Sequence, residues 1–117
     1  MIIKNSIIPR LLSNKYLYIN IYAITLYPFV FIRDEGDEIT NNHESIHLAQ
    51  QRELFVIPFY VLYVYEYLRN KIKGMNNDFA YRSISFEREA YSNQKNLTYL
   101  ETRDRMSWKK YKTQEVV

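Results

Sequence analysis

The sequence predicts an α+β fold that is mainly helical and has a short N-terminal antiparallel sheet. Between residues 16 and 33 the side chains alternate or favour β-structure, whereas from residue 40 onward apolar side chains recur at helical spacing. Only two glycines and three prolines interrupt the 117 residues, which favours long helices over many short strands joined by tight turns. At this length we expect one domain with one core, spanning residues 1–117.

Two segments predict the strands. Residues 16–23, YLYINIYA, place tyrosine or asparagine on one side and aliphatic residues on the other, in strict alternation. The next run, residues 25–33, is rich in β-favouring residues but contains Pro28, which cannot donate a hydrogen bond to a sheet ladder. Pro28 therefore places this strand at an edge or a bulge. An edge strand before the helical part would keep one row of backbone groups free to pair with an extended peptide.

The first helix is predicted to run from Thr40 to about residue 57, after a polar turn around Gly36. Asn41 and Glu44 have the form of a capping box, in which Asn41 is the N-cap and Glu44 reaches back to it. Pro58 then kinks or ends this helix, because proline lacks the backbone N–H that a helix interior needs.

Three further helices are predicted downstream. The first covers residues 59–73 and stops at Gly74, with basic residues in its last turns where cations suit the helix dipole. Residues 76–78 provide a loop and a cap for a helix over residues 79–94. A last helix is predicted over residues 97–112.

Charge and cysteine content limit the kinds of partner and metal ligand that this chain can have. The net charge of +3 and the mild grouping of acidic residues near 34–38 and basic residues near 103–112 are typical of solvated faces, so we expect no nucleic-acid partner. No cysteine is present, which excludes disulfides and thiolate metal ligands. The first residues, MIIKNSIIPRLLSNK, lack the pattern of a signal peptide, and we expect a cytoplasmic protein.

The most apolar segment is residues 54–68, LFVIPFYVLYVYEYL. It is shorter than the roughly 20 apolar residues that a spanning helix needs, and it contains a proline and a glutamate. We expect a helix buried in the core. The alternative is an interfacial helix that gives peripheral membrane association.

The pentapeptide HESIH holds both histidines of the chain, His43 and His47. On a helix, residues four apart lie on one face, so both imidazoles can converge on one metal ion. Glu44 is rotated by about 100° from His43, which lets it reach an activated water without being a ligand itself. The alternative is a solvent-facing helix turn whose two histidines titrate near neutral pH.

A catalytic zinc site needs a third protein ligand, and without cysteine or a third histidine this must be a carboxylate. If residues 79–94 form one helix, Glu87 falls on the apolar stripe that faces the core, where a lone carboxylate would cost several kcal/mol without a partner. Glu89 falls on another side, with Arg82 and Ser85, where water can solvate it. This favours Glu87 over Glu89 as the ligand; the alternative for Glu87 is an ion pair with an arginine, such as Arg52 or Arg103.

HESIH, followed by FEREAY at residues 86–91, resembles the gluzincin class of zinc metallopeptidases. The chain is also similar to a group of small bacterial zincin-like proteins with an HExIH helix, an aromatic helix and an FEREAY segment. The resemblance implies a minimal zincin-like domain with His43, His47 and Glu87 as zinc ligands and Glu44 as general base. It also implies that the edge strand before the HESIH helix docks a peptide or protein substrate.

One position departs from the gluzincin pattern. Many gluzincins place an aspartate three or four residues after the ligand glutamate, where it orients a histidine through the second ring nitrogen, but this chain has Ala90 and Tyr91. The Tyr91 hydroxyl or a backbone carbonyl is the expected substitute. A tyrosine or an arginine is expected to stabilise the oxyanion.

The leading hypothesis is therefore a zinc-dependent metallopeptidase in which Glu44 takes a proton from the attacking water and passes it to the leaving amine. The alternative is a zinc-binding protein-interaction or regulatory module without catalysis, because few residues follow Glu87 to wall an active-site cleft.

Overall fold

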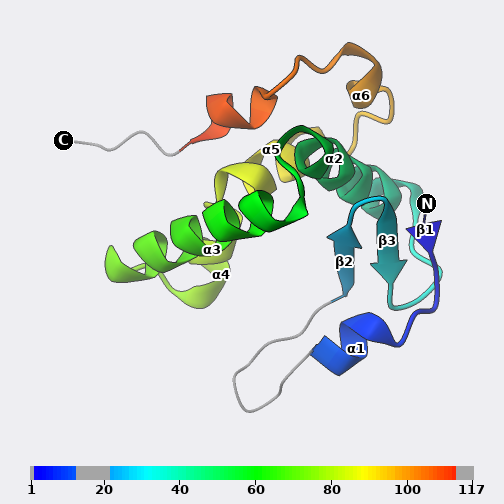
Figure 1. Ribbon diagram of the computed structural model, residues 1–117, viewed down its shortest axis with the longest axis horizontal. Helices are drawn as coiled ribbons and strands as arrows, with labels where there is room; N and C mark the ends of the chain where they lie inside the picture. The colour runs from blue at the N-terminus through cyan, green and yellow to red at the C-terminus, as the bar shows by residue number, and fades with distance from the viewer. Residues whose placement is uncertain (1, 13–21, 113–117) are drawn as a thin grey trace.

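The computed structural model describes residues 2–12 and 22–112 (Figure 1). A small sheet packs against helix α2 (Glu38–Leu54), and helices α3 (Val56–Ile72) and α5 (Ser85–Asn93) also pack against α2. The expected α+β, mainly helical architecture is confirmed.

The sheet has three described strands, β1 (Ile2–Ile3), β2 (Ala23–Leu26) and β3 (Phe29–Ile32), in the order β1-β3-β2. β2 and β3 are antiparallel, but β1 runs parallel to β3. The prediction of an antiparallel sheet is therefore right for the β2–β3 pair and wrong for β1.

The run predicted as one edge strand over residues 25–33 is instead a hairpin. The turn falls at Tyr27 and Pro28, where a proline removes no ladder hydrogen bond. The strand directly before α2 is the central strand β3, and the edge strand is β2. Of the strand predicted over residues 16–23, residues 16–21 lie outside the described residues, and Ala23 begins β2.

Helix α2 begins earlier than predicted. Its N-cap is Asp37, whose side chain accepts a hydrogen bond from the Thr40 amide at 2.7 Å. Asn41 is already inside the helix, since its amide donates to the Asp37 carbonyl at 2.8 Å. An aspartate cap satisfies an N-terminal amide and also suits the positive end of the helix dipole. Asp37 therefore has the N-cap role that was predicted for Asn41.

Pro58 neither ends nor kinks a helix. α2 stops at Leu54, and Phe55 joins it to α3 with φ 66°. Pro58 lies in the first turn of α3. Backbone N–H groups in a first turn have no acceptor within the helix, so proline costs no hydrogen bond there. α3 then runs to Ile72, close to the predicted end before Gly74, whose φ is 96°.

The helix predicted over residues 79–94 is divided into α4 (Asn77–Arg82) and α5. The break has a tertiary cause. Glu66 of α3 is buried, and its carboxylate accepts hydrogen bonds from the Ser85 amide at 2.9 Å and the Ser85 hydroxyl at 2.7 Å. This carboxylate satisfies a donor at the first turn of α5 and so fixes where α5 begins.

The helix predicted over residues 97–112 is also divided, into α6 (Tyr99–Thr102) and the 3₁₀ helix η2 (Ser107–Tyr111). A short helix α1 (Ile8–Leu12), which the sequence did not predict, precedes β2. A buried apolar cluster joins α3, α5 and η2 through Phe59, Ile84, Phe86 and Trp108.

The expectation that residues 54–68 are buried in the core is only half right. α3 buries the side that carries Phe59 and Glu66 and leaves its other side in solvent. Within residues 2–12 and 22–112, no helix combines the length and the apolar character needed to cross a bilayer.

Candidate metal centre

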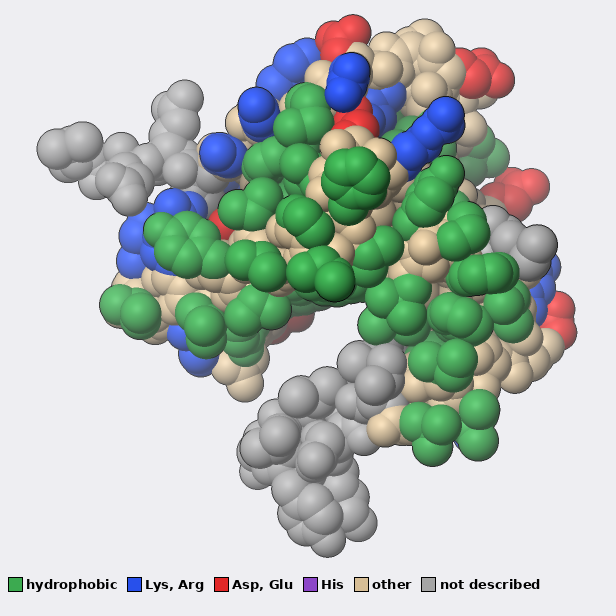
Figure 2. All heavy atoms as spheres, in the orientation of Figure 1, with side chains coloured by type: hydrophobic (Ala, Val, Ile, Leu, Met, Phe, Trp, Pro, Cys, Tyr) green, Lys and Arg blue, Asp and Glu red, His purple; other side chains and the backbone are tan. Residues whose placement is uncertain are grey.

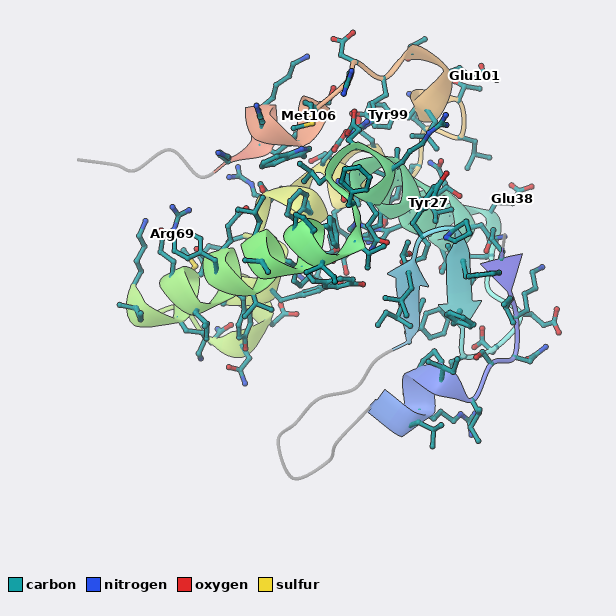
Figure 3. All side chains as sticks on the ribbon, in the orientation of Figure 1. Tyr27, Glu38, Arg69, Tyr99, Glu101 and Met106 are labelled. Atoms are coloured by element: carbon teal, nitrogen blue, oxygen red, sulfur yellow. The ribbon has the colours of Figure 1, made fainter. Side chains whose placement is uncertain are left out.

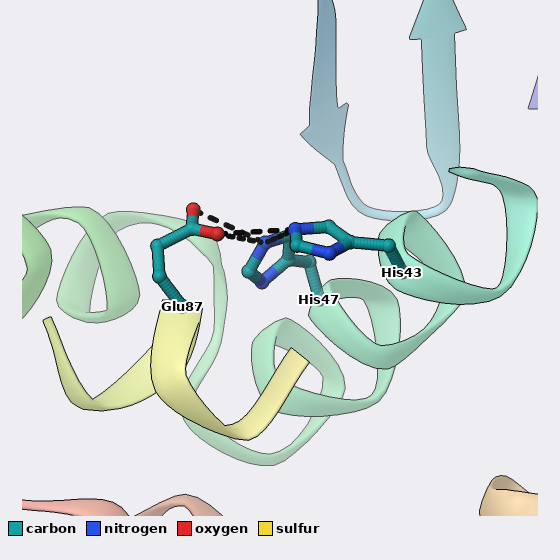
Figure 4. A group of neighbouring side chains, drawn as sticks. All are labelled: His43, His47 and Glu87. Atoms are coloured by element: carbon teal, nitrogen blue, oxygen red, sulfur yellow. Dashed lines mark hydrogen bonds and ion pairs between the residues drawn. The ribbon is translucent and has the colours of Figure 1, made fainter. Parts of the chain in front are cut away.

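His43 and His47 of α2 point toward Glu87 of α5 (Figure 4). Nε2 of His43 lies 3.0 Å from Oε1 of Glu87, Nε2 of His47 lies 3.2 Å from the same oxygen, and the two Nε2 atoms are 3.2 Å apart. The three side chains are buried, with 6%, 5% and 4% of each residue exposed. The alternative of a solvent-facing turn for the histidines is therefore wrong.

The spacing of these three atoms fits a metal ion. Zinc lies about 2.0–2.1 Å from each nitrogen or oxygen ligand, so neighbouring ligand atoms of a tetrahedral site are about 3.3 Å apart. The three atoms here are 3.0–3.2 Å apart, each from the others. Among the described residues, His43, His47 and Glu87 form the one group of three histidine or acidic side chains whose ligand atoms are close enough to hold a metal ion.

Two glutamines orient the imidazoles. Nδ1 of His43 lies 2.8 Å from Oε1 of Gln94, and Nδ1 of His47 lies 2.8 Å from Oε1 of Gln50. The expectation that Tyr91 takes this role is wrong. Its ring packs edge-on against His43 at 4.6 Å between centroids, and its hydroxyl pairs with the hydroxyl of Tyr81.

The contacts of Gln50 fix the tautomer of His47. The Gln50 amide nitrogen donates to the Phe86 carbonyl at 3.1 Å and to Glu89 at 2.9 Å, so the amide oxygen must face the imidazole. Nδ1 of His47 therefore donates, and its Nε2 is left to hold either a proton or a metal ion beside Glu87. A donor set arranged in this way attracts a cation.

The charges inside the site are strongly coupled. Burial alone would raise the pKa of Glu87, but the nearby charges of His47 and His43 outweigh it and hold that pKa well below its usual range. Burial likewise would lower the pKa of His47, yet the carboxylate of Glu87 raises it to about 9. Without a metal ion, a proton shared between His47 and Glu87 supplies the positive charge that this cluster needs.

Tyr63 of α3 holds the second oxygen of Glu87. Its hydroxyl donates to Oε2 at 2.6 Å. Burial, together with the charge of Glu87, raises the pKa of Tyr63 well above its usual value, so the phenol keeps the proton that it donates. Glu87 is thus fixed at both oxygens, which limits how far the carboxylate can rotate.

Glu44 lies beside the cluster and is not part of it. Its Oε2 accepts a hydrogen bond from the Thr25 hydroxyl of β2 at 2.9 Å. Its negative charge contributes to the raised pKa of His47. Glu44 is outside the group of His43, His47 and Glu87, and its role as general base stays a prediction.

Glu89 does not face solvent as expected. It is fully buried, and Arg103 binds it from Nε at 2.6 Å and from a second guanidinium nitrogen at 3.1 Å. Tyr99, labelled in Figure 3, donates to it at 2.6 Å. The segment that follows α5 folds back over this side of the helix, and that excludes the water on which the prediction relied.

The alternative of an ion pair between Glu87 and Arg103 is wrong. Arg103 pairs with Glu89 and with Glu53, at 2.9 Å from the latter, rather than with Glu87. The structure therefore separates the two candidate carboxylates: Glu87 lies with the histidines, and Glu89 with an arginine.

Four polar residues around the site were missed by sequence reasoning: Thr25, Gln50, Tyr63 and Gln94. One local signal existed for Gln50, which lies three residues after His47 and so on the same helix face. No comparable signal marked Tyr63 or Thr25, because their contacts join separate elements.

Comparisons of the chain with models of protein families, with curated proteins and with solved structures find no match. The interpretation of the site therefore depends on its own geometry.

Proposed function

We propose that this chain is a zinc-dependent peptide hydrolase in which His43, His47 and Glu87 hold the metal ion and Glu44 is the general base. The observation that carries the proposal is the convergence of two glutamine-oriented imidazoles and one fixed carboxylate oxygen at 3.0–3.2 Å from one another. The resemblance to gluzincins supports the same assignment.

The donor set supports zinc in particular. Two imidazole nitrogens and one carboxylate oxygen are the ligands of many hydrolytic zinc sites, which keep a fourth position open for water or substrate. Magnesium and calcium prefer sites made of oxygen ligands only. The chain has no cysteine, so the soft thiolate sites of other metals are ruled out.

When bound, zinc would acidify a water molecule and polarise the substrate carbonyl. Glu44 would accept a proton from the attacking water and then donate it to the leaving amine. The hydrogen bond from Thr25 holds one oxygen of Glu44 at 2.9 Å, and the other oxygen would carry out this transfer. Gln50, Gln94 and Tyr63 keep the ligands in place.

The substrate would pair with the first half of the edge strand β2. At Thr25 the outward carbonyl already accepts hydrogen bonds from Gln51 and from the Tyr60 hydroxyl, both at 2.7 Å. The Gln51 amide oxygen also accepts from the Tyr27 amide at 2.7 Å, so this side chain substitutes for a neighbouring strand. Residues of β2 that pair with β3 alternate with residues whose backbone groups point outward, and Ile24 is paired with Phe31. A peptide would therefore find its backbone partner at Ala23, two residues before Thr25.

The same contacts favour a second candidate, a zinc-binding module without catalysis. Thr25 of β2 is the strand residue that contacts Glu44, and its carbonyl already accepts hydrogen bonds from Gln51 and Tyr60. Less of the strand edge therefore remains for a substrate. Such a module would bind zinc through His43, His47 and Glu87 and leave peptides intact.

A digest of a peptide library by the zinc-loaded protein, with and without a chelator, separates the two candidates. The hydrolase predicts cleavage that the chelator abolishes and that Glu44→Gln loses while zinc stays bound. Glu101→Gln, a change at an exposed glutamate labelled in Figure 3, is the matched control and should cleave normally. Stoichiometric zinc with no cleavage by the parent protein would instead support the module.

A further inference from the structure

The outer side of α3 is apolar along its whole length. Its most exposed side chains include Ile57 and Ile72, of which 76% and 87% are exposed. The complete set of large apolar residues exposed on this helix is Ile57, Val61, Val64, Tyr65, Leu68 and Ile72. Isolated exposed apolar residues are ordinary, but a continuous set of them marks an interaction site.

These six side chains form one stripe, because their spacing of three, four or seven residues returns them to the same helix face. The opposite face carries Phe59, Glu66 and Asn70, which are buried against the rest of the protein. From Ile57 to Ile72 the stripe is about 22 Å long. We call this set of six residues the α3 stripe.

The apolar surface continues beyond α3. Figure 2 shows hydrophobic side chains gathered over α3, over the β2–β3 hairpin and over α1 on one broad face of the molecule. The exposed apolar residues of the hairpin and of the segment around α1 are Ile7, Leu11, Leu26, Tyr27 and Phe29. A helix from a single partner would cover the α3 stripe alone, whereas a flat surface would contact all three elements.

Basic groups border the stripe, and no exposed acidic group does along α3. Arg69, Lys71 and Lys73 stand in and just after the last turns, and the Arg69 guanidinium packs over the Tyr65 ring at 5.8 Å. The one acidic residue of α3, Glu66, is turned inward and bound to Ser85. The chain as a whole carries a net charge of +3.

From these observations we propose that this face binds the surface of a lipid bilayer that contains anionic lipids. The α3 stripe would lie in the plane of the interface with its apolar side chains among the acyl chains, and the basic residues would meet the lipid phosphates. Tyrosines such as Tyr65, at the border of the stripe, suit the boundary between headgroups and hydrocarbon. The proposal does not depend on the proposed hydrolase, since none of the residues of the stripe belongs to the metal centre.

Vesicle flotation tests the proposal. The full chain should float with vesicles of phosphatidylcholine and phosphatidylglycerol, and float less with phosphatidylcholine alone. The double variant Val61→Ser, Leu68→Ser should bind the vesicles at least about tenfold more weakly than the parent, because two apolar side chains leave the interface. The matched control is Leu97→Ser, Leu100→Ser, which removes exposed leucines near α6, away from the stripe, and should bind like the parent.

A second measurement does not depend on losing binding. The native tryptophan, Trp108, is buried, so Leu68→Trp adds an exposed fluorophore on the stripe. Brominated lipids should quench the added fluorescence. The proposal is overturned by an absence of flotation, by full binding of the serine variant, or by unquenched fluorescence at position 68. A dimer that the serine variant converts to a monomer, with no vesicle binding by the parent, would instead assign this face to a second copy of the chain.

Discussion

The amide oxygen of Gln50 lies 2.8 Å from Nδ1 of His47, while its amide nitrogen donates to Glu89 at 2.9 Å. This side chain therefore connects the candidate metal centre to the buried ion pair of Glu89 and Arg103. The position of the His47 imidazole therefore depends on Gln50 and, through Gln50, on Glu89.

Replacing Gln94 with alanine should weaken zinc binding about tenfold or more, because His43 loses the partner that fixes its ring and tautomer. Competition with a fluorescent zinc chelator measures the change. Ser92→Ala, a substitution at an exposed neighbour, provides the control. Zinc affinity of Gln94→Ala within twofold of the parent would show that the glutamine does not orient the ligand.

Tyr63→Phe should destabilise the metal-free protein by about 1–3 kcal/mol, because Oε2 of buried Glu87 loses its hydrogen bond from the phenol. Tyr67→Phe is a matched change one turn later on α3, where the hydroxyl bonds to exposed Asn77, and its cost should be near zero. Urea denaturation in the presence of a chelator measures both. Equal effects in the two variants would argue against a special role for Tyr63.

Arg103→Met should cost about 3–5 kcal/mol of folding free energy, because it leaves the fully buried carboxylate of Glu89 without its cation. Lys110→Met breaks an ion pair with Asp104 that is largely exposed, and it should cost about 1 kcal/mol or less. Denaturant titrations of both variants test the contrast. A cost for Arg103→Met no larger than that for Lys110→Met is not compatible with the network described above.

Zinc binding at pH 7 should release a proton from His47. The pKa of His47 is raised to about 9 in the metal-free protein, so its imidazole is mostly protonated at neutral pH and must become neutral to bind a metal ion. The release should be complete below that pKa and should decline as the pH rises through about 9. Calorimetry in buffers of different ionisation enthalpy measures it, and a binding enthalpy independent of buffer at pH 7 would refute the prediction.

The grouping of His43, His47 and Glu87 could be predicted from the sequence because its signals were local. The four-residue spacing of His43 and His47 needed only a helix, and the apolar neighbours of Glu87 were enough to expect its burial. The position of Glu89 could not be predicted in the same way. Its burial depends on Arg103 and Tyr99, which reach it from a segment that forms no long helix.

The predicted boundaries of the helices were wrong for a related reason. The break before α5 depends on Glu66, a residue of another helix, and no pattern within residues 79–94 announces it. Pro28 was expected to place its strand at an edge or a bulge, but it lies in the turn between β2 and β3. Local propensity predicted the elements, and contacts between distant residues decided where they begin and end.

The central claim is that His43, His47 and Glu87 bind one metal ion together. Zinc content per chain, measured by mass spectrometry on protein purified and dialysed against zinc, tests it most directly when the parent is compared with His47→Ala, Glu87→Ala and the exposed control Glu101→Ala. We predict one zinc per chain in the parent and in the control, and close to none in the other two variants. A parent protein without zinc, or a Glu87→Ala variant that keeps it with the parent's affinity, would contradict the account.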